Sequence, residues 1–132
     1  MKVVFTEGVF DLFHVGHLRA LKKARSLGSV LIVGVHNDDQ VETYKRRPVI
    51  PFEQRLEVVR SIECVTEAFE CPLAVDDDFY RHHAIDLHVQ GDDVGDHYTS
   101  GKRLKRIRFI GRDESTSTTE IIQRILLNYK LT

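Results

Sequence analysis

The chain has 132 residues, with 19 Lys and Arg against 20 Asp and Glu, and its formal net charge is −1. This length suits a single domain, and the missing basic surplus argues against a non-specific nucleic-acid binder. Hydrophobic residues make up 42% of the chain, the usual share for a globular protein, so disorder is not expected. Seven histidines beside no tryptophan and one methionine form an unusual mixture that calls for an explanation.

The sequence also bears on the compartment. No apolar stretch approaches the roughly 18 residues of a membrane span, and the first residues lack the apolar core of a signal peptide. Cys64 and Cys71 have neither disulfide-framework nor metal-ligand spacing, so we expect two reduced thiols. A cytoplasmic protein without a membrane span is therefore expected.

Strand-like and helix-like patterns alternate along the chain. The first strand, residues 2–6, is β-branched and aromatic, and residues 15–28 follow at helical spacing with Gly28 as the expected stop. The later predicted strands are residues 29–35, 65–70, 86–90 and 106–110, and the later helices are residues 37–43, 51–62, 76–84, 95–105 and 117–129. This order predicts an α/β fold, a single-domain Rossmann-like doubly wound parallel sheet of about five strands with helices on both faces, over residues 1–132.

Ligands of such sheets bind beyond the carboxyl ends of the strands, which directs attention to the segment after the first strand. There His14 and His17 open the first predicted helix with Gly16 between them. Two imidazoles at a helix N-terminus, beside free backbone N–H groups, make a suitable phosphate site, and Gly16 lets an anion come close. Helix caps or metal ligands are the alternative, although Asp11 is the only further ligand nearby.

Four segments in the same order resemble one family. Residues 8–17 (GVFDLFHVGH) resemble the His-x-Gly-His signature of the nucleotidyltransferase superfamily, in its small cytidylyltransferase-like branch. Residues 44–55, residues 91–93 (GDD) and residues 112–118 (RDESTST) resemble the basic loop, the Gly-Asp-Asp segment and the Arg-Thr-Glu-Gly-Ile-Ser-Thr signature of that branch. In length and motifs the chain is most similar to glycerol-3-phosphate cytidylyltransferases.

The resemblance implies transfer of CMP from CTP to a phosphorylated small alcohol, with release of pyrophosphate by direct in-line attack. Glycerol 3-phosphate is the first expectation for the acceptor, and phosphocholine and phosphoethanolamine are used in the same branch. Such chemistry needs positioning and charge neutralisation more than a nucleophilic side chain. The family also implies a homodimer and Mg²⁺ that arrives on the triphosphate, with no dedicated metal cage in the protein.

The implied site residues fall into three groups. The catalytic group is His14, His17, Lys45 and Arg112. The nucleotide-binding group is Gly8, Val9, Phe10, Asp11, Gly16, Arg46, Asp92, Asp93, Asp113, Glu114, Ser117, Thr118 and Thr119. The acceptor phosphate is assigned to Arg55 and Lys45, and the alternative for Arg55 is a surface ion pair with Glu53 or Glu57. Asp11 is expected to orient a histidine or support a divalent ion.

The start of the last predicted helix has two compatible interpretations. Ser117 and Glu120 have the spacing of a capping box, which is an ordinary structural device. The hydroxyls of Ser117, Thr118 and Thr119 can also hold phosphates at that helix N-terminus. Among the other histidines, His36 follows the second strand and is a ligand candidate, while a structural or surface role is expected for His82, His83, His88 and His97.

Other functions remain open at this point. Asp113, Ser115 and Thr116 replace threonine, glycine and isoleucine of the family signature, in a segment that helps form the nucleotide pocket. An adenylyltransferase of the same superfamily, acting on a sugar phosphate or FMN, is therefore one alternative. A non-catalytic nucleotide-binding domain is the other, and the intact His14, His17, Lys45 and Arg112 argue against it.

Overall fold

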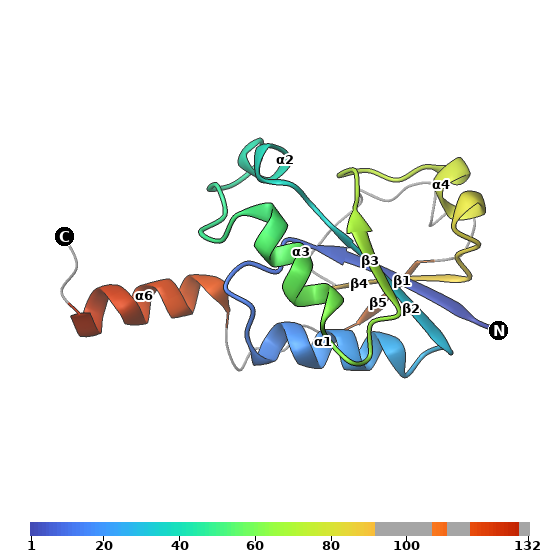
Figure 1. Ribbon diagram of the computed structural model, residues 1–132, viewed down its shortest axis with the longest axis horizontal. Helices are drawn as coiled ribbons and strands as arrows, with labels where there is room; N and C mark the ends of the chain where they lie inside the picture. Colours follow the sequence, from blue (N-terminus) through green and yellow to red (C-terminus); the bar gives the residue numbers. More distant parts are fainter. Residues whose placement is uncertain (92–106, 111–116, 130–132) are drawn as a thin grey trace.

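The computed structural model describes residues 1–91, 107–110 and 117–129, and its centre is a parallel sheet of five strands in the order β3-β2-β1-β4-β5 (Figure 1). The strands are β1 (Val3–Gly8), β2 (Val30–Val35), β3 (Glu67–Glu70), β4 (Leu87–Gly91) and β5 (Ile107–Ile110). The helices are α1 (Val15–Arg25), α2 (Asp38–Glu42), α3 (Phe52–Arg60), α4 (Asp77–His82) and α6 (Thr118–Tyr129). The predicted doubly wound sheet is confirmed, while the predicted helix over residues 95–105 lies outside the described residues.

The strand order reverses at β1. From β1 the chain moves outward through β2 to β3, and it then returns to place β4 on the other side of β1. All these pairs are parallel, so the carboxyl ends of β1, β2 and β4 meet at one edge of the sheet. Ligands of open α/β sheets bind at such a switch point, and this edge is where the histidine-bearing segment follows β1.

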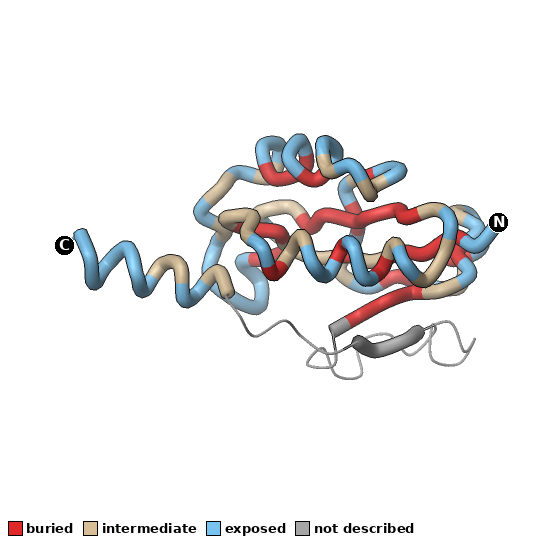
Figure 2. The backbone as a smooth tube through the Cα atoms, turned by 90° about the horizontal axis from the view of Figure 1, so that it is seen from below, coloured by how far each residue is buried: buried red, intermediate tan, exposed pale blue. Residues whose placement is uncertain are grey.

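Each face of the sheet has its own apolar core, because side chains alternate along a strand. On one face Val4, Leu31, Val33, Val35, Ala68 and Val89 pack with Leu21 and Ala24 of α1 and with Leu56 and Val59 of α3. On the other face Val3, Phe5, Ile32 and Cys71 pack with Tyr80 of α4 and with Val75 and Ile85. Figure 2 shows these buried positions along the strands and the inner sides of the helices. Helices on both faces were predicted, and this is confirmed.

Gly28 does not end α1 as a left-handed cap. The helix ends at Arg25, with Ser26 as its C-cap in the ordinary helical conformation. A Cβ at Gly28 would lie 2.6 Å from Val4 Cγ2 and 2.8 Å from the Lys2 carbonyl oxygen, so glycine is needed for close approach to β1. A stop glycine and a close-approach glycine look alike in a sequence, which explains the wrong prediction.

Helix α4 ends in a Schellman motif that lacks the usual glycine. The amide of Ile85 bonds to the carbonyl of Tyr80, and the amide of Ala84 bonds to the carbonyl of Arg81. Ala84 takes the left-handed conformation that the motif requires, with φ of 52°. Contact between Ile85 and Tyr80 in the core accompanies these bonds, so packing holds alanine in a position that favours glycine.

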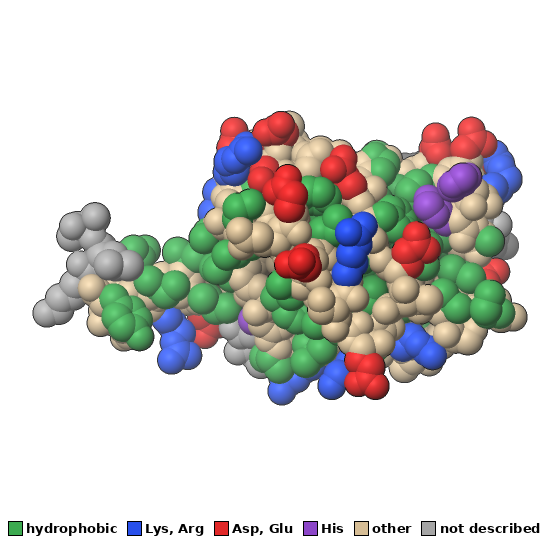
Figure 3. All heavy atoms as spheres, viewed as in Figure 1, with side chains coloured by type: hydrophobic (Ala, Val, Ile, Leu, Met, Phe, Trp, Pro, Cys, Tyr) green, Lys and Arg blue, Asp and Glu red, His purple; other side chains and the backbone are tan. Residues whose placement is uncertain are grey.

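Helix α6 extends away from the sheet, and none of its residues is buried (Figures 1 and 3). The side chains that it exposes include four large apolar ones, namely those of Ile125, Leu126, Leu127 and Tyr129. The homodimer expected from the family resemblance stays a prediction. Within the described residues, none of the helices is both long enough and apolar enough to cross a membrane.

Candidate active site

The first element of the site is a pair of histidine rings at the start of α1. His14 is the N-cap of α1, and its Nδ1 accepts a hydrogen bond from the Gly16 amide at 3.0 Å. His17 Nδ1 accepts one from the His14 amide at 3.2 Å, which completes a capping box made of two histidines. The two rings stack with their centroids 3.8 Å apart. The helix-cap alternative is therefore correct, and the same geometry leaves both rings at the positive end of a helix dipole.

This capping box determines the tautomers of both histidines. A backbone N–H can only donate, so each Nδ1 that accepts from one carries no proton. The ring proton of His14 and of His17 is then on Nε2. Two neutral imidazoles thus offer Nε2–H donors from the first turn of α1, which is the form needed to bind phosphate oxygens.

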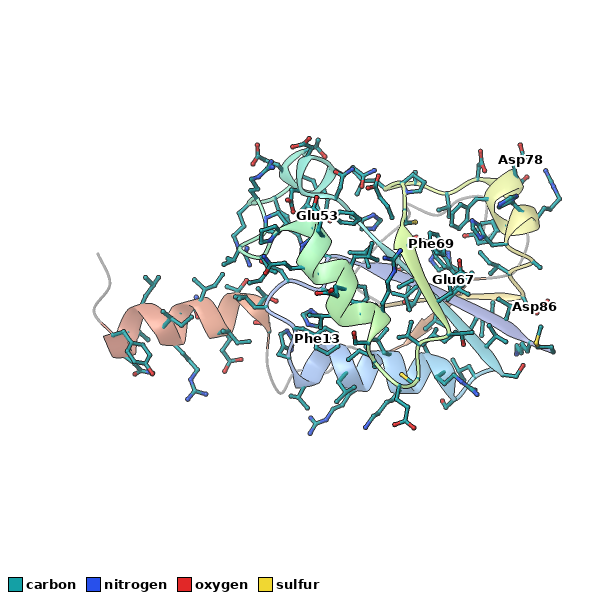
Figure 4. The ribbon with its side chains drawn as sticks, in the orientation of Figure 1. Phe13, Glu53, Glu67, Phe69, Asp78 and Asp86 are labelled. Atoms are coloured by element: carbon teal, nitrogen blue, oxygen red, sulfur yellow. The ribbon has the colours of Figure 1, made fainter. Side chains whose placement is uncertain are left out.

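The protonation of His17 agrees with this tautomer. Phe10 and Phe13 lie against its ring, with centroids 5.5 Å and 5.3 Å away, and Phe13 lies beside the first turn of α1 (Figure 4). Burial is the largest cause that lowers the pKa of His17 to about 4, and the nearby Lys45 ammonium lowers it further. His17 is therefore neutral near pH 7, and it stabilises charge as a hydrogen-bond donor rather than as a cation.

The turn that carries these histidines is strained. Phe10 and Leu12 both have positive φ, 56° and 48°, in the region that favours glycine. Such residues each cost about 1–3 kcal/mol, and they persist where the surroundings hold them. The Phe10 ring is buried and leaves little space over Gly8, where a Cβ would lie 3.2 Å from it. Residues 8–17, which we call the histidine segment, thus have a conformation imposed by packing.

Asp11 anchors a second segment, residues 44–51, which we call the basic loop. Its Oδ2 accepts from the Val49 amide at 2.8 Å and from Arg46 Nη1 at 3.2 Å, and its Oδ1 accepts from the Ile50 amide at 2.9 Å. Burial alone would raise the pKa of Asp11, but the amides of Ile50 and Val49 outweigh it and lower that pKa. The expectation that Asp11 orients a histidine or supports an ion is therefore replaced by a role as loop anchor.

Through this anchor the basic loop brings cations to the histidine pair. Lys45 lies close enough to His17 to contribute to its lowered pKa, and its ammonium is 5.5 Å from the centre of the Tyr44 ring. Arg46 is partly engaged by Asp11, and its side chain remains 45% exposed. Two of the predicted phosphate-binding cations thus lie beside the histidine segment, although they come from a distant part of the chain.

Arg55 is buried. Both sequence interpretations, a contact with the acceptor phosphate and a surface ion pair, had placed its side chain at the surface. It is 1% exposed, and its guanidinium donates to the carbonyls of Ile50, Val9 and His36 at 2.6–2.9 Å and to Asp38 Oδ1 at 2.7 Å. Glu53, one of the expected surface partners, is exposed at the start of α3 (Figure 4). The structure contradicts the assignment of Arg55 to the acceptor phosphate, because four of its five N–H donors are already used within the protein.

The start of α6 joins the same site. Thr118 Oγ1 donates to the Asp11 carbonyl oxygen at 2.8 Å, which links residues 107 positions apart in the chain. Ser117 Oγ accepts from the Glu120 amide at 3.0 Å, as the capping prediction requires, and Thr119 is exposed. The predicted ligands Asp92, Asp93, Arg112, Asp113 and Glu114 lie outside the described residues.

A second group of polar side chains lies under the opposite face of the sheet, and sequence reasoning missed most of it. This buried polar cluster consists of Glu7, His36, Cys71, Tyr80, His88 and Gln90. Glu7 at the end of β1 lies at its centre, with Oε1 3.6 Å from His36 Nε2 and Oε2 3.7 Å from His88 Nε2. The sequence signal that could have predicted this cluster is the presence of polar residues near the ends of otherwise apolar strands, at positions that alternate with the core.

The buried polar cluster is sealed by its own contacts. The Tyr80 hydroxyl and His88 Nδ1 share a hydrogen bond of 2.7 Å, and the Gln90 amide is 2.5 Å from His88 Nε2. Burial lowers the pKa of His88 to about 3, and burial beside the Glu7 carboxylate raises the pKa of the Cys71 thiol. His36 Nδ1 is 3.1 Å from the Cys71 carbonyl oxygen. His36 and His88 are therefore core residues, as expected for His88.

The described residues do not include a cluster of three or more acidic, histidine or cysteine ligands with metal-binding geometry. Asp11 is the carboxylate nearest the histidine pair in sequence, and the basic loop occupies both of its oxygens. A protein-held Mg²⁺ does not fit this part of the site.

The model of the family described as cytidylyltransferase-like matches residues 5–125 of this chain. The chain belongs to the cytidylyltransferase-like family. The match includes the histidine segment, the basic loop and the start of α6, which the structure brings together. Membership in the cytidylyltransferase-like family was the main inference from the four sequence segments, and it is confirmed.

Several curated members of the family are similar over nearly the whole chain. An ethanolamine-phosphate cytidylyltransferase of Dictyostelium discoideum is 37% identical over 94% of this chain and 36% of its own length. A probable choline-phosphate cytidylyltransferase of Schizosaccharomyces pombe is 34% identical over 96% of this chain and 37% of its own length. The bifunctional protein HldE of Citrifermentans bemidjiense is 35% identical over 97% of this chain and 28% of its own length.

This chain thus spans about a third of the length of the curated relatives that it matches. Among solved structures, the lipopolysaccharide core biosynthesis protein of Thermoplasma volcanium superimposes with a TM-score of 0.72 at 22% identity. That superposition covers 86% of this chain and 99% of the other, and it supports the fold alone.

Proposed function

We propose that this chain is a cytidylyltransferase that transfers CMP from CTP to phosphoethanolamine or a closely related phosphorylated amino alcohol. The observation that carries the proposal is the stacked pair of Nε2–H donors at the N-terminus of α1, with Lys45 beside it, in a chain of the cytidylyltransferase-like family. A helix N-terminus with two neutral imidazoles and a nearby ammonium suits a phosphate whose charge increases during reaction.

In the proposed reaction a phosphate oxygen of the acceptor attacks the α-phosphorus of CTP. The new P–O bond forms as the bond between the α-phosphorus and the bridging oxygen to the β-phosphate breaks, and pyrophosphate leaves with that electron pair. The acceptor supplies the nucleophile, so a covalent intermediate on the protein is not required. The protein contributes positioning and electrostatic stabilisation.

The roles of the residues follow from their places. His14 and His17 donate from Nε2 to oxygens of the reacting phosphates, and the aromatic wall of Phe10 and Phe13 keeps His17 neutral for that task. Lys45 supplies positive charge. Thr119 presents its hydroxyl at the start of α6, which Thr118 ties to Asp11, and Arg112 is expected to clamp the same phosphates.

The proposed acceptor changes the first expectation. Relatives named ethanolamine-phosphate cytidylyltransferase from Dictyostelium discoideum, Arabidopsis thaliana and Mus musculus are 34–37% identical to this chain, so phosphoethanolamine is preferred over glycerol 3-phosphate. Glu7 does not contribute to this preference, because its buried carboxylate is engaged by His36 and His88 inside the buried polar cluster.

Mg²⁺ has a limited place in this proposal. The described residues around Asp11 do not fit a metal cage, since the carboxylate is committed to the basic loop. Mg²⁺ bound to the triphosphate would offset phosphate charge, and no step of the mechanism is assigned to it here.

A pyrophosphate-release assay tests the proposed function. CTP and ATP are each supplied with phosphoethanolamine, phosphocholine, glycerol 3-phosphate, a heptose 1-phosphate or FMN, with Mg²⁺ present. We expect the highest kcat/KM with CTP and phosphoethanolamine. Preference for ATP would support the adenylyltransferase alternative, and nucleotide binding without turnover of any acceptor would support the non-catalytic alternative.

A further inference from the structure

The basic loop is held through its main chain at Ile50, by bonds to both the N–H and the C=O of that residue. The Ile50 amide donates to Asp11 Oδ1 at 2.9 Å, and the Ile50 carbonyl accepts from Arg55 Nε at 2.8 Å. The neighbouring Val49 amide donates to Asp11 Oδ2 at 2.8 Å. An acidic and a basic side chain therefore grip the same short stretch of backbone from opposite sides.

Both side chains also belong to, or contact, the histidine segment. Asp11 is part of that segment, and Arg55 Nη1 donates to the carbonyl of Val9, two residues earlier, at 2.6 Å. The contacts form a closed ring that runs from Asp11 through Ile50 and Arg55 to Val9 and back along the chain. Because the ring closes on backbone groups, it fixes the distance between the two segments.

Arg55 extends the ring to the next strand exit. Its Nη1 also donates to the His36 carbonyl after β2 at 2.9 Å, and its Nη2 donates to Asp38 Oδ1 in α2 at 2.7 Å. One buried guanidinium thus joins the segments that follow β1 and β2 to the basic loop. A lysine cannot reproduce this, because its single ammonium lacks the planar fork that reaches several acceptors.

The basic loop needs such an external support. Lys45, Arg46 and Arg47 are consecutive, exposed and of like charge, so they repel one another and provide little packing of their own. The loop also contains Pro48 and Pro51, which cannot donate backbone hydrogen bonds. Helix α2 holds the start of the loop, through the bond from the Lys45 amide to the Val41 carbonyl at 3.1 Å. The bonds of Asp11 and Arg55 hold its later part, at Val49 and Ile50.

We propose that Asp11 and Arg55 are positioning residues that together seat the basic loop on the histidine segment through the main chain of Val49 and Ile50, and so hold Lys45 beside His17. Neither residue contacts the phosphates. The catalytic consequence of this clamp rests on the proposed function, whereas the clamp itself is independent of any substrate.

Limited proteolysis with trypsin under native conditions tests the clamp directly, because Lys45 and Arg46 are exposed cleavage sites within the loop. In Asp11→Asn and in Arg55→Lys we expect cleavage after these residues to be about tenfold faster or more than in the unaltered chain. Cleavage after Arg19 and Lys22 in α1, followed by mass spectrometry of the same samples, reports on the rest of the fold. We expect the ratio of loop cleavage to α1 cleavage to rise in both variants.

Arg60→Lys is the matched control. Arg60 is on the same helix and makes one side-chain bond to a backbone carbonyl, that of Ala68 at 3.1 Å, away from the loop. We expect its cleavage ratio to stay unchanged. An unchanged ratio in Asp11→Asn and Arg55→Lys would overturn the clamp, and so would cleavage that accelerates equally in α1 and in the loop.

The kinetic part of the experiment measures kcat and KM for CTP in the same variants. We expect kcat to fall by about tenfold or more in Arg55→Lys and Asp11→Asn, because a displaced Lys45 no longer stabilises the transition state. Faster cleavage of the basic loop with an unchanged kcat would overturn the inference that the clamp positions Lys45 for catalysis. If the unaltered chain has no transferase activity, the proposed function fails, and the cleavage ratios still decide whether the clamp exists.

Discussion

Two pairs of histidines lie on opposite sides of the sheet, and their surroundings differ. His14 and His17 lie at the N-terminus of α1 on one side, with both Nδ1 atoms used by the capping box and the ring protons on Nε2. His36 and His88 lie on the other side of the sheet in the buried polar cluster, 4% and 0% exposed. The first pair is arranged to bind a ligand, and the second is arranged around Glu7.

The comparison shows that the surroundings decide what a histidine does. Burial lowers the pKa of both His17 and His88, to about 4 and about 3. In His17 the neutral form leaves a donor at a helix N-terminus, whereas in His88 both ring nitrogens have partners in Tyr80, Gln90 and Glu7. A lowered pKa therefore does not by itself mark a functional histidine.

The largest effect is expected for His17. We expect His17→Ala to lower kcat by about 10²-fold or more, because one donor to the charge of the transition state is lost. The variant also loses the bond to the His14 amide, which should lower the free energy of unfolding by about 1–2 kcal/mol. His82→Ala, on the exposed side of α4, is the control and should keep full activity. Steady-state pyrophosphate release measures both, and equal rates for the two variants would contradict the catalytic role.

Acid is expected to act on one histidine of each pair, His17 and His88, in the same direction. The unfolded chain takes up protons on His17 and His88 near pH 6.5, whereas the folded chain does so only near pH 4 and 3. The free energy of unfolding should therefore fall as the pH is lowered from about 6.5 to 4, by up to about 1.4 kcal/mol per pH unit for each group.

Urea unfolding at pH 7, 6 and 5 measures this slope. His88→Asn should make the slope shallower, since one of the two groups no longer titrates. A slope that is identical with and without His88 would contradict the assignment of a lowered pKa to that residue.

Tyr80 tests whether the buried polar cluster contributes to stability rather than to catalysis. Tyr80→Phe removes the hydroxyl that shares a 2.7 Å hydrogen bond with His88, and should lower the free energy of unfolding by about 1–3 kcal/mol. We expect its kcat to stay within about twofold of the unaltered value. Tyr129, which is 71% exposed on α6, is the control, and Tyr129→Phe should change neither quantity. A large loss of kcat in Tyr80→Phe would contradict a purely structural role of the buried polar cluster.

The smallest effect is expected at Ala84. Glycine adopts its left-handed conformation without strain, so Ala84→Gly should stabilise the chain by about 1 kcal/mol with unchanged activity. Ala24→Gly, inside α1, should destabilise it by about that amount or more. Thermal unfolding distinguishes the two, and a loss of stability in Ala84→Gly would contradict the strained cap.

Most of the fold and the centre of the site could be predicted from the sequence because they depend on local patterns. Alternating strands and helices, the histidine pair beside Gly16 and the cap at Ser117 are encoded by neighbouring residues. The environment of Arg55 could not be predicted, because its partners at Val9, His36 and Ile50 are backbone carbonyls brought together only by the tertiary fold. The same holds for Asp11.

The buried polar cluster was missed for a related reason. Glu7 ends an apolar strand, and its contacts with His36 and His88 come from two other strands of the sheet. Its significance depends on which face of the strand it occupies and on what lies opposite, and neither is contained in the motif that follows it. The comparison with relatives, rather than the motif, favours phosphoethanolamine over glycerol 3-phosphate.

Phosphorus-31 NMR of CTP and phosphoethanolamine incubated with the protein and with His17→Ala tests the central claim most directly. The account predicts that the unaltered chain converts CTP into equal amounts of CDP-ethanolamine and pyrophosphate, and that His17→Ala leaves CTP almost unchanged over the same period. Unreacted CTP with the unaltered chain, or equal conversion by both proteins, would contradict it.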